Sequence, residues 1–267
     1  MADAWPHRKE WSKSLQKKLV FLLIFFSIVT HGKPLSSGWE LWYPYQYRNA
    51  EQELVGLDFD IFNAVIQQAK LDVNYTEELP WKRHINYIKS GVVDLAMGAS
   101  MTDERRKFAY FSLPYRFETV NLFVRKGMAK KMPLHSLSDI IDSSYLIGVE
   151  GGYFYGKQYQ ELINQRAFQA HISEVLDLER NVTLLLKGHI DGFFVDPVTL
   201  NAFVKKYNMQ DEFELHPLPV YSAKIHIMLS KKTHAPGVIR QLNQAIVTLQ
   251  ENGTLDSIIQ HWTDLQN

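Results

Sequence analysis

The chain has 267 residues, 46% of them hydrophobic and 22% charged, which is enough for one large domain or two small ones of ordinary globular composition. Lysine and arginine together number 29, as do aspartate and glutamate, so the formal net charge is zero and no global field draws the protein to nucleic acid or to an anionic membrane. The sequence has no cysteine, which excludes disulfides, cysteine-ligated zinc, thiol catalysis and lipid attachment through a cysteine.

The first 32 residues have the pattern of a secretory signal peptide. Lys17 and Lys18 precede an apolar run, Leu19–Phe26, and a small-residue end follows at Thr30–Gly32. The apolar core is well short of the ~20 residues that a membrane-spanning helix needs. A retained amino-terminal anchor is the alternative. An exported protein without cysteine is expected in the bacterial periplasm.

Strand and helix patterns alternate after this leader, which predicts an α/β architecture. In chain order, the first set comprises a strand over 39–42, a helix from 56, a strand over 71–75, a helix from 80 to 91 and a strand over 92–97. Pro80 suits a first helical position and Gly91 a helix end. The apolar side chains of both helices recur at helical spacing.

A second alternating set begins near residue 126. It comprises a strand over 145–149, a helix led by Gly151 and Gly152, a helix over 176–186, a strand over 190–195, a helix from 196, a strand over 225–229 and two final helices that meet at Gly253. No proline- or glycine-rich linker separates the two sets. Strands that cross between two lobes are therefore expected near 121–125 and 222–229.

Arg105 follows the predicted strand over 92–97 and lies where a helix is expected to begin. Its planar guanidinium matches a carboxylate, and open α/β folds bind ligands at the carboxyl ends of their strands. Gly98 lets a ligand approach the backbone there, and Ser100 supplies a hydroxyl. A solvated run of charges at a helix start is the alternative interpretation of this segment.

Two tryptophans and two carboxylates are further candidates. Trp42 and Trp81 lie near turns, where an aromatic pair can hold an apolar, planar or cationic ligand. Packing in the core is the alternative. Asp196 ends a strand before Pro197, and it either caps the next helix or accepts hydrogen bonds from a ligand ammonium. Glu150 ends another strand beside a glycine pair, where its charge favours a cation but the backbone favours an anion.

Signals for metal binding and covalent catalysis are weak. The histidines are scattered and none forms an HExxH pair, and the sequence has neither a GxSxG elbow nor a phosphate-binding loop. Asp58 and Asp60 have metal-like spacing, but nothing completes a site. We expect no metal, no cofactor and no catalytic residue.

A series of short motifs runs through the chain after the leader. They are Tyr43–Gln46, Gly56–Asp60, Gly91 with Asp94, Thr102–Arg105, Phe111–Tyr115, Gly188–Asp191 with Asp196, and Asn252–Thr254. In this order and spacing they resemble the bacterial periplasmic solute-binding proteins of the polar amino-acid class, called solute-binding family 3. The resemblance extends over residues 39–266.

The resemblance implies a two-lobed α/β fold of the type II periplasmic binding class, in which each lobe is a sheet flanked by helices. Two crossing hinge strands join the lobes, which close over a ligand. Lobe I would comprise residues 38–124 and 222–267, and lobe II residues 125–221.

The resemblance also implies roles for individual residues. Arg105 matches the arginine that pairs with the α-carboxylate of the ligand, and Asp196 matches the acid that holds its α-ammonium. Trp42 and Trp81 match the two apolar positions beside the ligand side chain.

The grip on the carboxylate is expected to differ between the lobes. Gly98 and Ser100 match a backbone contact and a hydroxyl donor in the family. On the other lobe the family usually has a glycine followed by threonines, whereas this chain reads Gly-Gly-Tyr-Phe-Tyr from Gly151. Gly151 and Tyr153 are the candidate contacts there, and the aromatic composition suits an aromatic or cationic ligand body.

The expected function is capture of a small polar solute, an amino acid or related zwitterion, for an ABC-type importer. The expected partners are that ligand and a membrane permease, and the protein is expected to be a monomer. One alternative is a ligand-sensing partner of a membrane receptor. The other is a dehydratase-like enzyme on the same fold, for which Glu150 is the candidate acid or base.

Overall fold

The computed structural model describes residues 33–266. The predicted signal peptide therefore lies outside the described residues. From Pro34 onward the described chain forms one compact unit. Within residues 33–266, no helix is both long and apolar enough to span a bilayer.

The first half of the described chain contains most of the parallel strands of one lobe. Its elements are β1 (Leu35–Trp39), β2 (Tyr47–Arg48), β3 (Leu54–Val55), α2 (Leu57–Gln68), β4 (Val73–Glu78), α3 (Trp81–Ser90), β5 (Leu95–Ser100), α4 (Asp103–Arg106), β6 (Ala109–Phe111) and β7 (Arg116–Arg125). Gly91 ends α3 in the left-handed conformation, with φ at 79°, as the sequence predicts.

The second half completes the other lobe and then returns to the first. Its elements are η1 (Ala129–Lys131), η2 (Leu137–Ile140), β8 (Ile147–Glu150), α5 (Gly156–Leu162), α6 (Arg166–Gln169), β9 (Ile172–Val175), α7 (Leu178–Leu186), β10 (Gly192–Val195), α8 (Pro197–Tyr207), β11 (Phe213–Ser230), α9 (Gly237–Glu251) and α10 (Thr254–Gln266).

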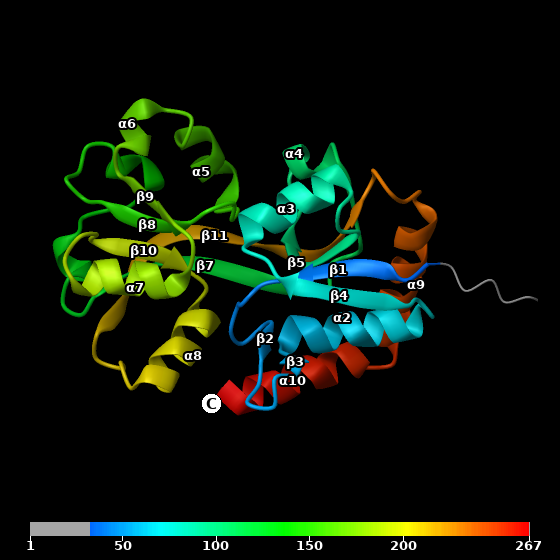
Figure 1. The fold of residues 1–267 in the computed structure, drawn as a ribbon. Helices are drawn as coiled ribbons and strands as arrows, with labels where there is room; N and C mark the ends of the chain where they lie inside the picture. Colours follow the sequence, from blue (N-terminus) through cyan, green and yellow to red (C-terminus); the bar gives the residue numbers. More distant parts are fainter. Residues whose placement is uncertain (1–32, 267) are drawn as a thin grey trace, which may run out of the picture. The chain divides into compact units, whose positions relative to one another are not determined.

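One nine-stranded sheet extends through both lobes in the order β4–β1–β5–β11–β7–β10–β8–β9, with β6 paired to β11 (Figure 1). The strands on either side are parallel, whereas β7 and β11 are antiparallel to each other. Residues 213–225 of β11 pair with β7, and residues 225–229 pair with β5. These two long strands therefore connect the lobes.

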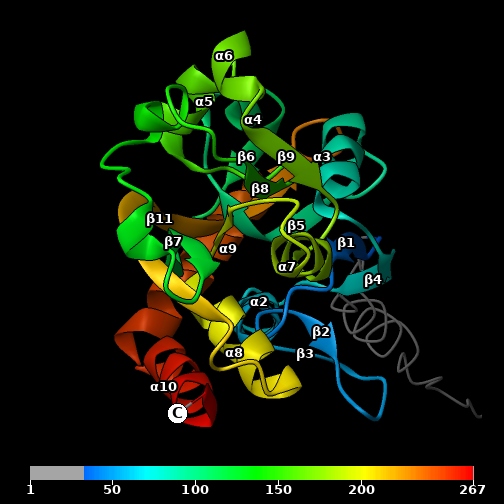
Figure 2. The same ribbon diagram turned by 90° about the vertical axis from the view of Figure 1, so that its left-hand side faces the viewer.

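Separate hydrophobic cores form on the two sides of these crossing strands. We call lobe I the part that packs α2, α9 and α10 on one face of its strands and α3 on the other. We call lobe II the part built on β8, β9 and β10 with α5 and α7, whose cores draw on residues between 120 and 220. Figure 2 shows α8 of lobe II beside α10 of lobe I, and the two helices are in contact.

The expected boundaries of three strands in lobe I are wrong by a few residues, and the strand expected over 71–75 is β4, at Val73–Glu78. The strand expected over 39–42 is β1, which ends at Trp39, while Trp42 only bridges to Gln46 in a turn. The strand expected over 92–97 is β5, so Gly98 and Ser100 lie within the strand and not after it. An apolar run shows that a strand is present but does not fix its ends.

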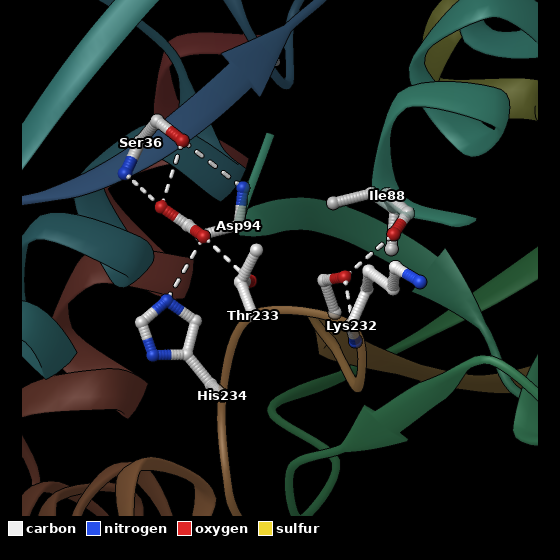
Figure 3. Close-up of polar contacts among 7 residues, drawn as sticks. Ser36, Ile88, Asp94, Lys232, Thr233 and His234 are labelled. Carbon is white, nitrogen blue, oxygen red and sulfur yellow. Dashed lines mark hydrogen bonds and ion pairs between the residues drawn. The ribbon is translucent and has the colours of Figure 1, made fainter. Parts of the chain in front are cut away.

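A polar cluster fixes the amino end of β5 (Figure 3). The carboxylate of Asp94 accepts hydrogen bonds from the backbone and hydroxyl of Ser36, from Thr233 Oγ1 at 2.7 Å and from His234 Nε2 at 2.9 Å. Burial alone would raise the pKa of Asp94, but these hydrogen bonds hold it below its ordinary value. Asp94 therefore ties β1, β5 and the loop before α9 together.

The helix expected after Gly151 and Gly152 is α5, but it starts later than the glycine pair suggests. The next helix, α5, begins only at Gly156. Gly152 and Gly156 have φ values of 87° and 93°, which lie outside the helical region. Residues 151–155 instead form a loop that follows β8.

Candidate functional site

Arg105 is buried at the interface of the lobes. Thr102 caps the short helix α4 by accepting a hydrogen bond from the backbone of Arg105. The guanidinium donates from Nη1 to the carbonyl of Ser100 at 2.8 Å and from Nη2 to the carbonyl of Gly152, in lobe II, at 2.9 Å. Burial lowers the pKa of Arg105 to about 10, so the side chain keeps its charge at neutral pH. Its two carbonyl partners leave that charge without a counter-ion.

Aromatic rings gather next to Arg105. Trp81 is the first residue of α3, and the guanidinium of Arg105 lies 5.6 Å from its ring centroid. The ring of Tyr153, in lobe II, contacts both Trp42 and Trp81, with centroid distances of 6.0 and 6.3 Å. Tyr153, itself a predicted contact, therefore lies against both predicted tryptophans.

Asp196 directly follows β10 and caps the next helix, which is one of the two roles that its sequence position allows. Its side chain caps α8 by accepting a hydrogen bond from the backbone of Thr199 at 2.9 Å. The same oxygen accepts a second hydrogen bond from the hydroxyl of Tyr45, in lobe I, at 2.9 Å. Burial raises the pKa of Asp196. Nearby, Trp42 Nε1 donates to Thr199 Oγ1 at 3.0 Å, so this contact also crosses between the lobes.

The remaining predicted residues line the same region with their backbones. The Gly98 N–H donates to the Tyr115 hydroxyl at 2.8 Å, and a Cβ at Gly98 would lie 3.1 Å from the Trp42 ring. Ser100 contributes its carbonyl to Arg105. Gly151 packs against Glu174, whose carboxylate pairs with Lys82 across the lobes at 2.7 Å.

Three glutamates share this region, of which Glu40 and Glu118 are buried and Glu150 is partly exposed. Burial raises the pKa of Glu118 to about 7 and that of the Glu150 carboxyl to about 8, and it raises the pKa of Glu40 well above its ordinary value. Repulsion among the acids adds to these shifts, since Glu118 faces Asp196 and both Glu40 and Glu150 face Glu118. Each carboxyl would ionise more readily beside a cation.

Sequence reasoning missed Glu40 and Glu118. A signal for Glu118 exists in the alternation of β7, because Arg116, Glu118 and Val120 fall on the same buried face of the strand. A charge in phase with buried apolar positions has to be paired or functional. Glu40 follows directly after β1 and carries no comparable pattern.

Arg116 forms its ion pair with Asp58, although its charge still opposes the rise in the pKa of Glu118 and of Asp196. Its guanidinium makes a bidentate ion pair with Asp58, with Nε–Oδ1 and Nη2–Oδ2 distances of 2.6 and 2.7 Å, and both side chains are buried. Asp60, the other member of the metal-like pair, accepts a hydrogen bond from Trp262 Nε1. Within residues 33–266, no group of acids or histidines has the arrangement of a metal site.

Two cavities lie near the site, and only the smaller contains predicted residues. A cavity of about 300 Å³ is bounded by Arg105, Glu150 and Tyr153, among others. A larger one of about 690 Å³ lies between α8, α10 and the crossing strands, and none of the predicted binding residues lines it. Arg105 and Tyr153 therefore border the smaller cavity, whereas Tyr45, the partner of Asp196, lines the larger one.

Comparisons with known proteins show the family of the chain. A model of the bacterial extracellular solute-binding proteins, family 3, matches residues 37–265. The arginine-binding periplasmic protein of Mannheimia haemolytica is 24% identical over 254 residues, which are 92% of this chain and 98% of the relative. The probable histidine-binding protein of Neisseria gonorrhoeae is 24% identical over 220 residues, which are 80% of this chain and 77% of the relative.

A solved structure shows the same fold. The arginine-, lysine-, histidine-binding protein ArtJ from Geobacillus stearothermophilus superposes with a TM-score of 0.71 at 22% identity, and the match covers 86% of this chain and 95% of that one. The expectation of a two-lobed type II periplasmic binding fold is thereby confirmed.

Proposed function

Because the chain belongs to the bacterial extracellular solute-binding proteins, family 3, we propose that it captures an amino acid with a cationic side chain between its two lobes. The observation that carries this proposal is the imbalance of buried charge. Glu40, Glu118 and Asp196 face a region in which Arg105 is the cation without a carboxylate partner, since Arg116 is neutralised by Asp58.

The α-carboxylate and α-ammonium groups of the ligand fit opposite walls of the site. A carboxylate matches the planar fork of Arg105 and supplies the charge that a backbone carbonyl lacks. The ammonium fits Asp196, whose carboxylate is buried and already accepts hydrogen bonds from Thr199 and Tyr45. Arg105 belongs to lobe I and Asp196 to lobe II, so a bound zwitterion would join the lobes.

The ligand side chain fits among the aromatic rings and the two glutamates. Trp42 and Trp81 offer ring faces that attract a cation. Glu40 and Glu118 are each 7% exposed, and a desolvated carboxylate gains more from a cation than an exposed one does. The names of the two relatives, an arginine-binding and a probable histidine-binding protein, support the same class of ligand.

The test is a thermal-shift panel of the twenty amino acids, followed by calorimetry. We expect L-arginine, L-lysine or L-histidine to raise the melting temperature and L-leucine and L-glutamate to leave it unchanged. A ligand at 100 times its Kd adds about 2.7 kcal/mol to the free energy of unfolding.

The matched variants are Glu118→Gln, which removes a buried charge of the site, and Glu251→Gln, which removes an exposed charge at the end of α9. We expect the first to weaken binding and the second to bind like the wild type. Equal shifts for cationic and neutral amino acids would overturn the assignment of the side chain.

Hinged closure is part of the proposal, with lobe I formed by residues 38–124 and 222–267 and lobe II by residues 125–221. The separate cores on the two sides of β7 and β11 support two lobes, although residues 120–124 of β7 pack in the cores of lobe II. X-ray scattering with and without ligand tests closure, and a larger radius of gyration in the presence of ligand would contradict it.

We also propose that the protein acts as a monomer in the periplasm and delivers its ligand to the membrane permease of an ABC importer. Removal of the predicted signal peptide, residues 1–32, would accompany export. Light scattering of the purified protein tests the monomer. Amino-terminal sequencing of the exported protein tests the cleavage and separates it from a retained anchor.

A dehydratase-like enzyme is the second candidate, because the pKa of Glu150, about 8, suits an acid that works near neutral pH. We favour a binding protein, because the two relatives named above are binding proteins. Incubation with L-arginine and with prephenate should return both compounds unchanged. Turnover that Glu150→Gln abolishes would reverse this preference.

A further inference from the structure

The groups that would anchor a ligand are all engaged by other parts of the same chain. The guanidinium of Arg105 holds the carbonyl of Gly152, and the carboxylate of Asp196 holds the hydroxyl of Tyr45. The rings of Trp42 and Trp81 hold the ring of Tyr153. In each case the anchor and its partner come from opposite lobes.

The side chain of Tyr153 occupies the contacts that are proposed for the ligand side chain. Its ring lies against both tryptophans, and its hydroxyl donates to Oε1 of the buried Glu40 at 3.0 Å. A planar group with a donor at its far end is also the shape of a guanidinium or an imidazolium side chain. Tyr153 therefore satisfies the same aromatic faces and the same carboxylate that a cationic ligand would use.

The backbone around Tyr153 is shaped for this approach. Gly152 has a φ of 87°, and a Cβ added there would lie 3.1 Å from the Cα of Lys82 in α3. Only glycine allows the loop to come so close to lobe I. Because α5 begins at Gly156, the preceding loop is free to extend across the interface.

We propose that the segment Gly152–Tyr153 is a built-in competitor for the ligand site, which holds the lobes together until a ligand displaces it. The class of ligand that displaces the segment rests on the proposed function. The role of the segment in holding the lobes together does not depend on that function. The carbonyl of Gly152 competes with the ligand carboxylate for Arg105. The side chain of Tyr153 competes with the ligand side chain for the aromatic site and Glu40.

A competitor of this kind raises the apparent Kd by the inverse of the fraction of molecules in which it has left the site. If the segment is displaced in one molecule in ten, the apparent Kd is about tenfold higher than that of the free site. A residue that only contacts the ligand has the opposite effect, because its removal weakens binding. The two roles of Tyr153 therefore predict changes of opposite sign.

The first experiment needs no ligand and is small-angle X-ray scattering of the purified protein. Tyr153→Ala removes the ring, and Phe154→Ala is the matched control because its ring packs on Tyr221, at a centroid distance of 5.0 Å. We expect Tyr153→Ala to have a larger radius of gyration than the wild type and Phe154→Ala to be unchanged. A radius for Tyr153→Ala equal to that of the wild type would overturn the proposal.

The second experiment is calorimetric titration with L-arginine. Tyr153→Ala should bind about tenfold more tightly than the wild type or better, and Phe154→Ala should bind like the wild type. Tyr153→Phe keeps the ring and loses only the donor to Glu40, so it tests the proposal with minimal change in packing and should fall between the two. Unchanged or weaker binding by both Tyr153 variants would overturn the proposal.

The two experiments separate the competitor from the proposed function. If no cationic amino acid binds to the wild type or to any variant, the assignment of the ligand fails. The scattering comparison then still decides whether Tyr153 holds the lobes together.

Discussion

At the scale of single residues, two buried arginines have different roles because their partners differ. Arg116 is neutralised by the bidentate carboxylate of Asp58, so its environment is complete. Arg105 donates to two carbonyls, which satisfy its hydrogen bonds but not its charge. A buried cation without a counter-ion is costly, and an anionic ligand group removes that cost.

His84 gives a prediction for stability, since it is buried and its Nε2 lies 3.1 Å from the carbonyl of Leu95. Burial lowers its pKa from 6.5 to about 4. Between pH 6.5 and pH 4, His84 binds a proton in the unfolded chain but not in the folded protein. The contribution of His84 to the free energy of unfolding is therefore fully present above pH 6.5. It is lost, by about 3 kcal/mol in total, as the pH decreases to 4.

Urea unfolding between pH 4 and pH 7 measures this effect. His84→Gln keeps a hydrogen-bond donor but does not titrate, so its stability should depend less on pH than that of the wild type. Identical pH profiles for the two proteins would show that His84 does not contribute to the pH dependence of stability.

The sequence singles out some residues that the structure buries between the lobes and misses others. Arg105 and Asp196 are singled out because each lies between a strand and a helix, which is a local pattern. The contact of Tyr153 with Trp42 and Trp81 joins residues from two lobes, and no local pattern contains it. Glu118 is detectable only once the alternation of β7 is recognised.

At the scale of elements, helix ends are predicted better than strand ends. Gly91 and the Asp196–Pro197 pair are specific signals, and the structure ends α3 and begins α8 at these residues. The strand expected over 92–97 is displaced because a buried apolar run carries no end signal. The glycine pair at 151 has positive φ at Gly152, so it extends a loop and starts no helix.

The packing of α7 on β8 makes a second prediction. A Cβ at Gly148 would lie 2.1 Å from Oδ1 of Asn181 and 2.8 Å from Ile190, so Gly148→Ala should lower the free energy of unfolding by about 1–3 kcal/mol. Asn181→Ala in the same chain removes the main clash and should restore part of the loss.

The control for this pair is Gly237→Ala, at the start of α9. There the added Cβ would meet only Arg240, at 3.9 Å, and alanine favours the helix. Urea unfolding should find this variant as stable as the wild type or more so. A Gly148→Ala protein of wild-type stability would contradict the described packing.

At the scale of the whole molecule, zero net charge coexists with a strongly acidic interior between the lobes. The acids come from both lobes and from the crossing strand β7, so closure brings like charges together. Protons on Glu118 and Glu150 limit the resulting repulsion near neutral pH, where their pKa values are about 7 and 8. A cationic ligand would do the same.

The affinity for a cationic ligand should therefore depend on pH. Glu118 is mostly protonated at pH 6 and mostly ionised at pH 8, so the affinity for L-arginine should rise about tenfold across this interval. Glu118→Gln should bind more weakly and lose most of the pH dependence. Calorimetry at pH 6, 7 and 8 measures both, and a pH-independent wild type would exclude Glu118 from the site.

The most direct test of the central claim is calorimetric titration of the wild type and Arg105→Ala with L-arginine at pH 8. The zwitterion site between Arg105 and Asp196 predicts one molecule bound per wild-type chain and no measurable binding to Arg105→Ala. Wild-type affinity in Arg105→Ala, or no binding of any amino acid by the wild type, would contradict it.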